Sequence, residues 1–256
     1  MADPVLHIDG LTRDFGDFRA VDDVSLTIQA GTITGLIGPN GAGKTTLFNV
    51  LTGMLPPTAG RVFLNGQDVT SKAPDKLFAL GMGRTFQIPR PFAKMSVLEN
   101  VMLAPLAQAG ERLWGPFLSA GKMRDQEAAI RKKAMEVLDF VTLALLADQA
   151  AGQISGGQMK LLELARILMG DPKLILLDEP AAGVNPTLTN TLIEKIEELN
   201  RGGKTFVIIE HDMDFVMEHC NPVIALAEGR KVFEGTAEEA QNNTVLLDAY
   251  LGAQVA

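Results

Sequence analysis

The sequence predicts an α/β fold that is interrupted by a mostly helical segment. Runs rich in apolar and β-branched residues, which are typical of strands, occur at residues 5–11, 24–28, 33–38, 61–69, 174–180, 205–212 and 222–235. Between residues 97 and 169 most of the chain has helical periodicity instead. The third observation is a glycine-rich loop at residues 38–46, which follows an apolar strand and opens a helical run.

Turn signals and prolines divide the chain into these elements. Asn65-Gly66 marks a turn within residues 61–69, and residues 222–235 are expected to form a hairpin that turns near Glu228-Gly229. From residue 89 onward, prolines break the strand pattern before the helical part begins. We therefore expect a discontinuous organisation, with an α/β core at residues 1–87 and 171–256 and a helical subdomain at residues 88–170.

Composition narrows the class of protein. The 256 residues include 23 Lys and Arg against 31 Asp and Glu, so the net charge is −8, and 46% are hydrophobic, as in a globular chain. The acidic balance disfavours nucleic acid as the main partner, because a phosphate backbone requires a basic surface. Cys220 is the sole cysteine, which excludes an internal disulfide framework and suits a reducing cytoplasm.

The sequence contains no segment that resembles a membrane span. Its longest uncharged stretch, residues 24–43, is interrupted by polar residues and glycines, whereas a bilayer helix needs about 20 mainly apolar residues. The first ten residues lack the positive and apolar regions of a secretory signal. If the protein works at a membrane, we expect it to do so from the cytoplasmic side through partners.

The loop GPNGAGKTT fits the phosphate-binding pattern G-x-x-x-x-G-K-[ST]. Glycines let backbone N–H groups converge on phosphate oxygens, and the following helix N-terminus adds a favourable dipole. We expect Lys44 to contact the β- and γ-phosphates of a nucleotide and the Thr45 hydroxyl to bind Mg²⁺. The alternative is a glycine-rich turn that happens to precede a lysine. The predicted binding residues are Gly38, Pro39, Asn40, Gly41, Ala42, Gly43, Lys44, Thr45 and Thr46.

A second motif is the apolar run at residues 174–177, which ends in Asp178 and Glu179. A buried parallel strand has this pattern, and ligands of open α/β sheets bind beyond the carboxyl ends of such strands. We expect Asp178 to hold Mg²⁺ and Glu179 to act as general base on a water molecule. The alternative is an acidic pair at the start of a helix.

A third motif, Ser155-Gly156-Gly157-Gln158, precedes a segment with an apolar helical face. Ser155 stands at the position of an N-cap, and the two glycines leave the helix N-terminus open to an anion. A plain N-cap after a glycine-rich loop is the alternative. The sequence thus contains two helix N-termini suited to phosphate.

Together these motifs make the chain similar to the ATP-binding-cassette (ABC) ATPases. Residues 38–45 match the Walker A motif of that family, residues 174–178 match Walker B, and residues 154–158 match the signature LSGGQ, with Ile154 in place of leucine. Gln87 matches the Q-loop glutamine and His211 the switch histidine. The motifs follow the family's order across residues 6–252, although Asn185 stands where many members have aspartate.

The resemblance implies a P-loop ATPase with a mixed sheet core, an antiparallel β subdomain and an inserted helical subdomain. It also implies a dimer in which two ATP molecules lie between two cassettes. Each ATP would be held by Walker A of one cassette and by the signature of the other, so that Ser155, Gly156, Gly157 and Gln158 would reach ATP on the partner.

The same resemblance assigns three further residues. Phe15 falls at the aromatic position that stacks on adenine, and a strand-end core aromatic is its alternative. His211 would contact the γ-phosphate and hold the catalytic geometry. Gln87 would touch Mg²⁺ or the attacking water.

The segments RTFQIPRPFAKMSVLENV, LLDEPAAGVNP, IIEHDM and AYLG resemble the ATP-binding subunits of bacterial high-affinity branched-chain amino acid importers. That resemblance implies ATP-powered uptake through separate membrane permease subunits, with a second cassette (identical or paralogous) and, indirectly, a periplasmic or extracellular solute-binding protein. It implies a peripheral position at the cytoplasmic face of the inner membrane. Cassettes for urea, amides, aromatic acids or lipopolysaccharide, and soluble ABC ATPases, are the alternatives. Four residues near the start of the helical subdomain would either line a permease groove or form ordinary subdomain core: Phe86, Ile88, Phe92 and Met95.

Overall fold

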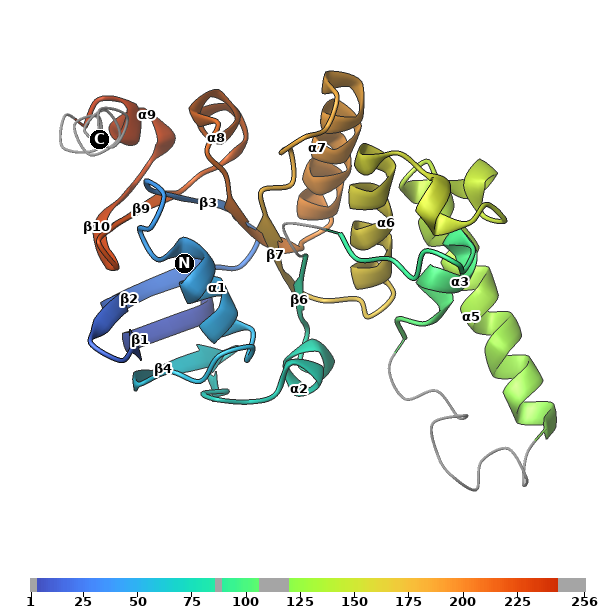
Figure 1. Cartoon of the computed structure of the whole chain (residues 1–256), viewed down its shortest axis with the longest axis horizontal. Helices are drawn as coiled ribbons and strands as arrows, with labels where there is room; N and C mark the ends of the chain where they lie inside the picture. The colour runs from blue at the N-terminus through green and yellow to red at the C-terminus, as the bar shows by residue number, and fades with distance from the viewer. Residues whose placement is uncertain (1–3, 86–88, 106–119, 244–256) are drawn as a thin grey trace. The chain divides into compact units, whose positions relative to one another are not determined.

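The computed structural model describes residues 4–85, 89–105 and 120–243, with the backbone alone for residues 120–123 (Figure 1). The chain forms two compact units. The first comprises residues 1–87, 173–182 and 196–256, and the second comprises residues 88–172 and 183–195. From the sequence, residues 183–195 were expected in the α/β core. They belong to the second unit because Val184 and Leu188 pack closely on Gly157. If residue 157 carried a Cβ, that atom would lie 2.6 Å from the Leu188 side chain.

The first unit contains a four-stranded antiparallel sheet in the order β2-β1-β4-β5, counting the described residues. Two long strands, β1 and β2, form a hairpin in which Phe15 pairs with Phe18. The turn predicted at Asn65-Gly66 is confirmed between β4 and β5. The bounds of these strands are Pro4–Phe15 (β1), Phe18–Gln29 (β2), Ala59–Leu64 (β4) and Gln67–Asp68 (β5).

A second, mixed sheet of the same unit has the order β10-β9-β3-β8-β7-β6 across the described chain. Its strands from β9 to β6 are parallel, and β10 pairs antiparallel with β9 through the predicted turn at Glu228-Gly229. The strands are Ile33–Ile37 (β3), Met82–Arg84 (β6), Leu174–Asp178 (β7), Thr205–Ile209 (β8), Val223–Ala227 (β9) and Arg230–Gly235 (β10). Every residue of β7 and β8 is buried, which explains their unbroken apolar runs.

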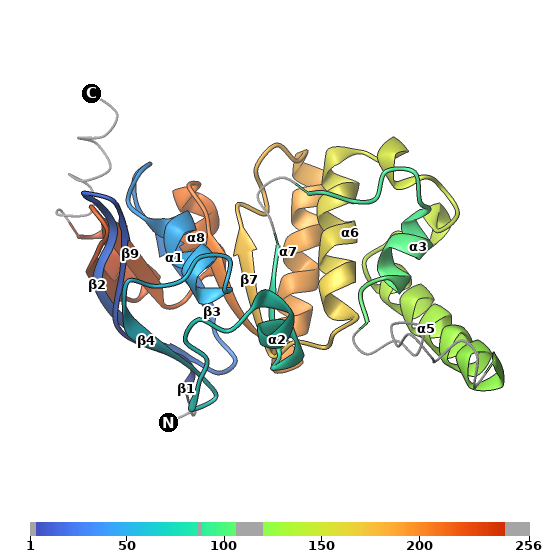
Figure 2. The ribbon, with the colours of Figure 1, turned by 60° about the horizontal axis from the view of Figure 1, so that its bottom comes forward.

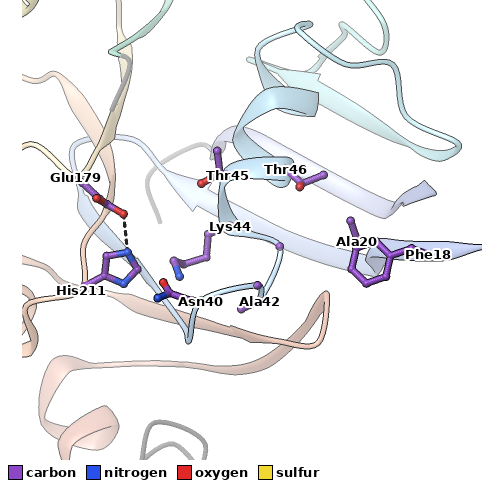
Figure 3. A pocket seen from close by; sticks show the side chains of 11 residues that line it. Phe18, Ala20, Asn40, Ala42, Lys44, Thr45, Thr46, Glu179 and His211 are labelled. Atoms are coloured by element: carbon purple, nitrogen blue, oxygen red, sulfur yellow. Dashed lines mark hydrogen bonds and ion pairs between the residues drawn. The ribbon is translucent and has the colours of Figure 1, made fainter. Parts of the chain in front are cut away.

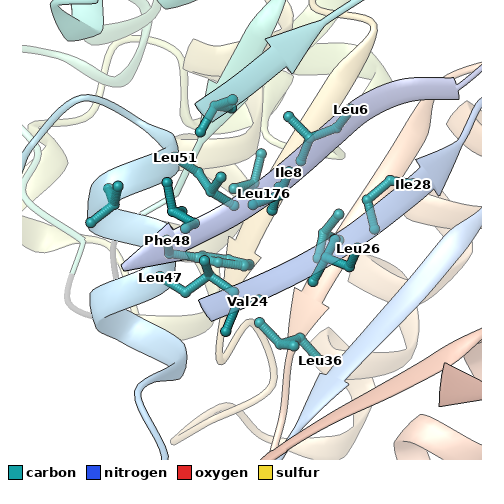
Figure 4. Close-up of a cluster of buried hydrophobic side chains, with 14 of the residues drawn as sticks. Leu6, Ile8, Val24, Leu26, Ile28, Leu36, Leu47, Phe48, Leu51 and Leu176 are labelled. Carbon is teal, nitrogen blue, oxygen red and sulfur yellow. The ribbon is translucent and has the colours of Figure 1, made fainter. Parts of the chain in front are cut away.

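Helix α1 (Lys44–Leu51) packs between these two sheets. Its Leu47, Phe48 and Leu51 join a buried cluster with side chains from β1 and β2 and with Leu36 of β3 and Leu176 of β7 (Figure 4). Figure 2 shows α1 beside the strands of the antiparallel sheet. This burial fixes the start of α1, and therefore the glycine-rich loop before it, relative to the strand ends.

The described part of the first unit also contains three short helices, α2 (Pro74–Ala79), α8 (Met213–His219) and α9 (Ala237–Gln241). The longer α7 (Pro186–Arg201) ends in this unit. Asp212 caps α8 by accepting the N–H groups of Asp214 and Phe215. Cys220, after α8, is a buried free thiol, and burial raises its pKa to about 12.

The second unit is helical. It contains α3 (Val97–Met102), α5 (Ala120–Phe140), α6 (Gly156–Leu168), the start of α7 and two short 3-10 turns, Ala144–Leu146 and Ala151–Gln153. Helices α3, α5 and α6 pack on one another. Of the expected groove residues, Phe92 is exposed and Met95 is partly buried, and Phe86 and Ile88 lie outside the described residues. The α/β fold with a mixed sheet, an antiparallel sheet and helices is confirmed.

Candidate active site

Three loops that follow β3, β7 and β8 meet at one edge of the mixed sheet. These strands are parallel neighbours, so their carboxyl ends lie on the same side. The loop after β3 carries Gly38 to Thr46, the loop after β7 begins at Glu179, and the loop after β8 begins at Glu210. The topology therefore brings together residues that are far apart in the sequence.

The glycine-rich loop has a backbone that two of its positions reserve for glycine. Gly38 has φ 149° and Gly43 has φ 95°, values that side chains disfavour. A Cβ would lie 2.2 Å from the Leu226 carbonyl oxygen at Gly38 and 2.3 Å from the Ala20 carbonyl oxygen at Gly43. The loop is thus held against β2 and β9, and α1 begins without a side-chain cap, which leaves its first N–H groups for an anion.

Lys44 stands at the first position of α1 and is 6% exposed. Its ammonium donates hydrogen bonds to the carbonyl oxygens of Gly38 at 2.6 Å and Pro39 at 3.0 Å. Burial lowers the pKa of Lys44, and the carboxylates of Glu179 and Asp178 oppose this shift. The site therefore holds a largely desolvated cation, whose positive charge attracts phosphate.

Glu179 and His211 form a pair across two of the loops. His211 Nε2 lies 2.5 Å from Glu179 Oε1 (Figure 3), and their side chains are 40% and 15% exposed respectively. Glu179 has φ 48°, in the left-handed region that residues with side chains seldom adopt. A carboxylate that is oriented by an imidazole at the mouth of a cavity can act as a general base.

A cavity of about 310 Å³ opens over the glycine-rich loop. Its lining comprises Phe18, Ala20, Asn40, Gly41, Ala42, Gly43, Lys44, Thr45, Thr46, Glu179 and His211. In Figure 3, Glu179 and His211 lie at one end of the site, Phe18 and Ala20 lie at the other, and Lys44 points in between. The structure thus brings most of the predicted Walker A residues together with two of the three expected catalytic side chains, those of Glu179 and His211.

The aromatic residue at the far end of the cavity was missed from the sequence. Among the described residues it is Phe18, 64% exposed, that lines the cavity, and not Phe15. Phe15 is 44% exposed, and the Arg13 guanidinium lies 4.7 Å from its ring centroid. The pairing of Phe15 with Phe18 across the hairpin turn is the signal that could have indicated both rings.

Asp178, at the last position of β7, is 2% exposed and does not belong to the described cavity lining. Arg84 of β6 donates to its Oδ2 at 3.1 Å. The same guanidinium donates to Asn49 of α1 at 2.6 Å and to Thr52, which directly follows α1, at 3.1 Å. Arg84 was not among the site residues predicted from the sequence. This ion pair joins the predicted metal ligand to the helix that follows the glycine-rich loop.

Glu210 is a second buried group that sequence analysis missed. It is 4% exposed and accepts the backbone N–H of Ala181 at 2.9 Å and that of His211 at 3.1 Å. Burial raises the pKa of Glu210, the two N–H donors act in the opposite direction, and the Glu179 carboxylate raises it further.

The signature residues lie in the second unit, at the start of α6. Ser155 is the N-cap of this helix: its hydroxyl accepts the Gln158 N–H at 3.3 Å, and the Gln158 side chain accepts the Ser155 N–H at 2.8 Å. Gly156 is exposed, and a Cβ there would meet nothing within 4 Å. The predicted N-cap at Ser155 is present. The predicted Q-loop residue, Gln87, lies outside the described residues.

The chemistry of Thr45 and Asp178 fits a hard divalent cation. Thr45 is exposed at the cavity, and Asp178 ends the strand whose next residue, Glu179, lines it. Hydroxyl and carboxylate oxygens suit Mg²⁺ when phosphate oxygens and water supply the remaining ligands. Within the described residues, no group of three or more His, Cys, Asp or Glu side chains could hold a metal ion.

Comparison with known proteins agrees with this geometry. The profile of a family described as ABC transporter matches residues 21–182, which include the glycine-rich loop, the signature and the end of β7. The chain belongs to the ABC transporter family. It is similar to the probable branched-chain amino acid transport ATP-binding protein LivG of Archaeoglobus fulgidus, with 41% identity over 98% of this chain and 96% of that protein.

Other relatives and structures support the same assignment. The high-affinity branched-chain amino acid transport ATP-binding protein LivG of Escherichia coli K12 is 37% identical over 98% of this chain and 99% of its own length. A nucleotide-free ATP-binding cassette from an ABC transporter has a TM-score of 0.85 at 36% identity, covering 96% of this chain and 98% of that one. A dimeric post-hydrolysis cassette bound to ADP and Pi has a TM-score of 0.74 at 25% identity, covering 91% and 98%.

This chain is therefore an ATP-binding cassette of the ABC transporter family and a transport ATPase. In the described part of the chain, no helix combines the length and the apolar character that crossing a bilayer requires.

Proposed function

We propose that this cassette hydrolyses ATP to power the uptake of branched-chain amino acids through separate permease subunits. The observation that carries the proposal is one cavity that joins the Lys44 loop to the Glu179–His211 pair. The choice of amino acid import is supported by the names of relatives that are 41% and 37% identical over nearly the whole chain.

ATP would bind with its phosphates on the glycine-rich loop. The N–H groups at the start of α1 and the Lys44 ammonium would replace phosphate hydration, and Lys44 would exchange its bonds to Gly38 and Pro39 for phosphate oxygens. The base would lie toward Phe18 at the other end of the cavity, and Phe15 remains the residue proposed to stack on adenine.

Hydrolysis requires a base that takes a proton from the attacking water. Glu179 is proposed for this step, and His211 would hold its carboxylate in place and reach the γ-phosphate. Lys44 would neutralise the negative charge that develops on the phosphate oxygens.

Mg²⁺ would be held by Thr45, Asp178 and the proposed Q-loop residue Gln87. The cation supplies charge neutralisation at the phosphates. Arg84 would keep the Asp178 carboxylate oriented through its bonds to α1. Because Arg84 is buried with Asp178, this orientation is set before any ligand arrives.

The proposed working unit is a dimer of cassettes at the cytoplasmic face of the membrane. The start of α6, with Ser155, Gly156, Gly157 and Gln158, would contact the ATP of a second cassette, as the dimeric state of a structural relative supports. ATP that is shared across an interface favours the closed dimer, and hydrolysis would release it. Permease subunits, fed by a solute-binding protein, would follow this cycle through the helical unit.

The experiment is to copurify the cassette with its membrane partners, reconstitute the complex in vesicles and measure ATP hydrolysis with added solutes. We expect leucine, isoleucine or valine, with the matching solute-binding protein, to stimulate hydrolysis several-fold, and urea, acetamide and benzoate to have no effect. If only urea, acetamide or benzoate stimulated hydrolysis, the class of that compound would replace branched-chain amino acids as the proposed substrate. Activation by a polynucleotide, without a membrane partner, would contradict the transport function.

A further inference from the structure

Glu210 lies between the two loops that carry the proposed catalytic pair. It follows β8 directly, and its neighbour along the chain is His211. The adjacent strand β7 ends at Asp178, which pairs with Ile209, and the Glu179 N–H still donates to the Ile209 carbonyl at 2.9 Å. Beyond that bond the ladder stops, and the two loops need another connection to keep a fixed separation.

The Glu210 carboxylate makes that connection with both of its oxygens. Oε1 accepts the N–H of Ala181, on the loop of Glu179, and Oε2 accepts the N–H of His211, on its own loop. With 4% exposure, the carboxylate is shielded from water that would compete for these bonds. One side chain therefore ties the backbone two residues beyond Glu179 to the backbone of His211.

The backbone of Glu179 has a conformation that contacts on both sides of it support. Its φ of 48° lies in the left-handed region, which residues with side chains seldom adopt. The Ile209 carbonyl holds its N–H, and Glu210 holds the chain two residues later, so Glu179 is fixed on both sides. Its side chain can then meet His211 Nε2.

We propose that Glu210 is a positioning residue for ATP hydrolysis, which sets the separation of the loops that bear Glu179 and His211. The inference rests on the proposed function and adds a residue to it. Burial raises the pKa of Glu210 because its carboxylate is costly to desolvate. An apolar side chain would avoid that cost, but it would leave the N–H groups of Ala181 and His211 without their acceptor.

The test is Glu210→Gln in the full-length cassette, assayed with ATP and Mg²⁺. Glutamine keeps the size of the side chain but offers one acceptor oxygen, and its NH₂ group opposes the second backbone N–H. Because a small misplacement of reacting groups is costly, we expect kcat to fall between about 10-fold and 100-fold. KM for ATP and ATP affinity should stay within about twofold, because the Lys44 loop keeps its contacts.

A matched control and a second background separate positioning from general stability. Glu197→Gln removes a carboxylate that contacts His219 at 3.1 Å in the same unit, and we expect its kcat to match wild type. In a His211→Ala background, Glu210→Gln should lower kcat by a clearly smaller factor than in wild type, because the two residues act together. If Glu210→Gln does not fold, as judged by thermal melting, Glu210→Asp is assayed in the same way.

The outcomes distinguish the two proposals. An unchanged kcat in folded Glu210 variants of an active wild type would overturn the positioning role, as would equal factors in the two backgrounds. A wild-type chain without any ATP hydrolysis would instead contradict the proposed function itself.

Discussion

Lys44, Glu179 and His211 reach one cavity because β3, β7 and β8 run parallel and end at the same edge. Each side chain stands within the first residues after its strand, or at the start of the next helix, where a strand register sets its position. Less visible residues then support them. The side chains of Arg84 and Glu210 are buried, and neither lines the described cavity. Arg84 orients the Asp178 carboxylate, and Glu210 holds the backbone of the two loops.

Arg84 supplies the residue-scale prediction. Its side chain is 8% exposed and that of Asp178 is 2% exposed, so removal of the guanidinium breaks a buried ion pair. Such a loss costs about 3–5 kcal/mol in unfolding free energy, which we expect for Arg84→Ala in urea denaturation. The control is Arg19→Ala, which breaks ion pairs of a 53% exposed guanidinium and should lower the unfolding free energy far less, because solvent screens exposed ion pairs. Equal losses of unfolding free energy in the two variants would contradict a stabilising role of the buried Arg84–Asp178 ion pair.

At the scale of elements, α1 and α6 present two different helix N-termini. Helix α1 follows a glycine in the left-handed region and has no side-chain cap, whereas α6 has a complete capping box from Ser155 and Gln158. The capping bonds stabilise the start of α6 without any ligand. The proposed role toward a partner's ATP is an additional one, and it needs a variant that keeps the cap.

Ser155→Asp is that variant. Aspartate is as good an N-cap as serine, so the unfolding free energy should change by less than about 0.5 kcal/mol. Its negative charge would face the γ-phosphate in the proposed dimer, so ATP hydrolysis should fall at least about tenfold. Ser155→Asn, which caps the helix without the charge, is the control and should retain more activity than Ser155→Asp. Full hydrolysis by a stable Ser155→Asp would exclude a phosphate near this helix end.

Elements with a local signature were predictable from the sequence. The buried strands β7 and β8 appear as unbroken apolar runs, and the turns at Asn65-Gly66 and Glu228-Gly229 have the expected residues. Arg84 and Glu210 were not predictable. Arg84 pairs with a residue 94 positions away, and Glu210 with one 29 positions away, and no local pattern shows such a partner. Phe18 was missed because the family resemblance indicated Phe15.

For the whole molecule, the net charge of −8 and the cationic loop at Lys44 are compatible, because the buried ammonium acts locally while the acidic surface faces solvent. The two units divide the proposed chemistry. The first holds the cavity with the glycine-rich loop and the Glu179–His211 pair, and the second holds the signature helix. In the proposed dimer, each ATP would contact the first unit of one chain and the second unit of the other.

The most direct test of the account is the rate of phosphate release from ATP and Mg²⁺ by wild type and by Glu179→Gln, with ATP binding measured on the same samples. Glutamine cannot accept the proton of the attacking water, and general base catalysis contributes about 10²-fold to 10⁴-fold. We therefore predict at least a hundredfold slower release with unchanged ATP affinity. Release at the wild-type rate by Glu179→Gln would contradict the assignment of the base.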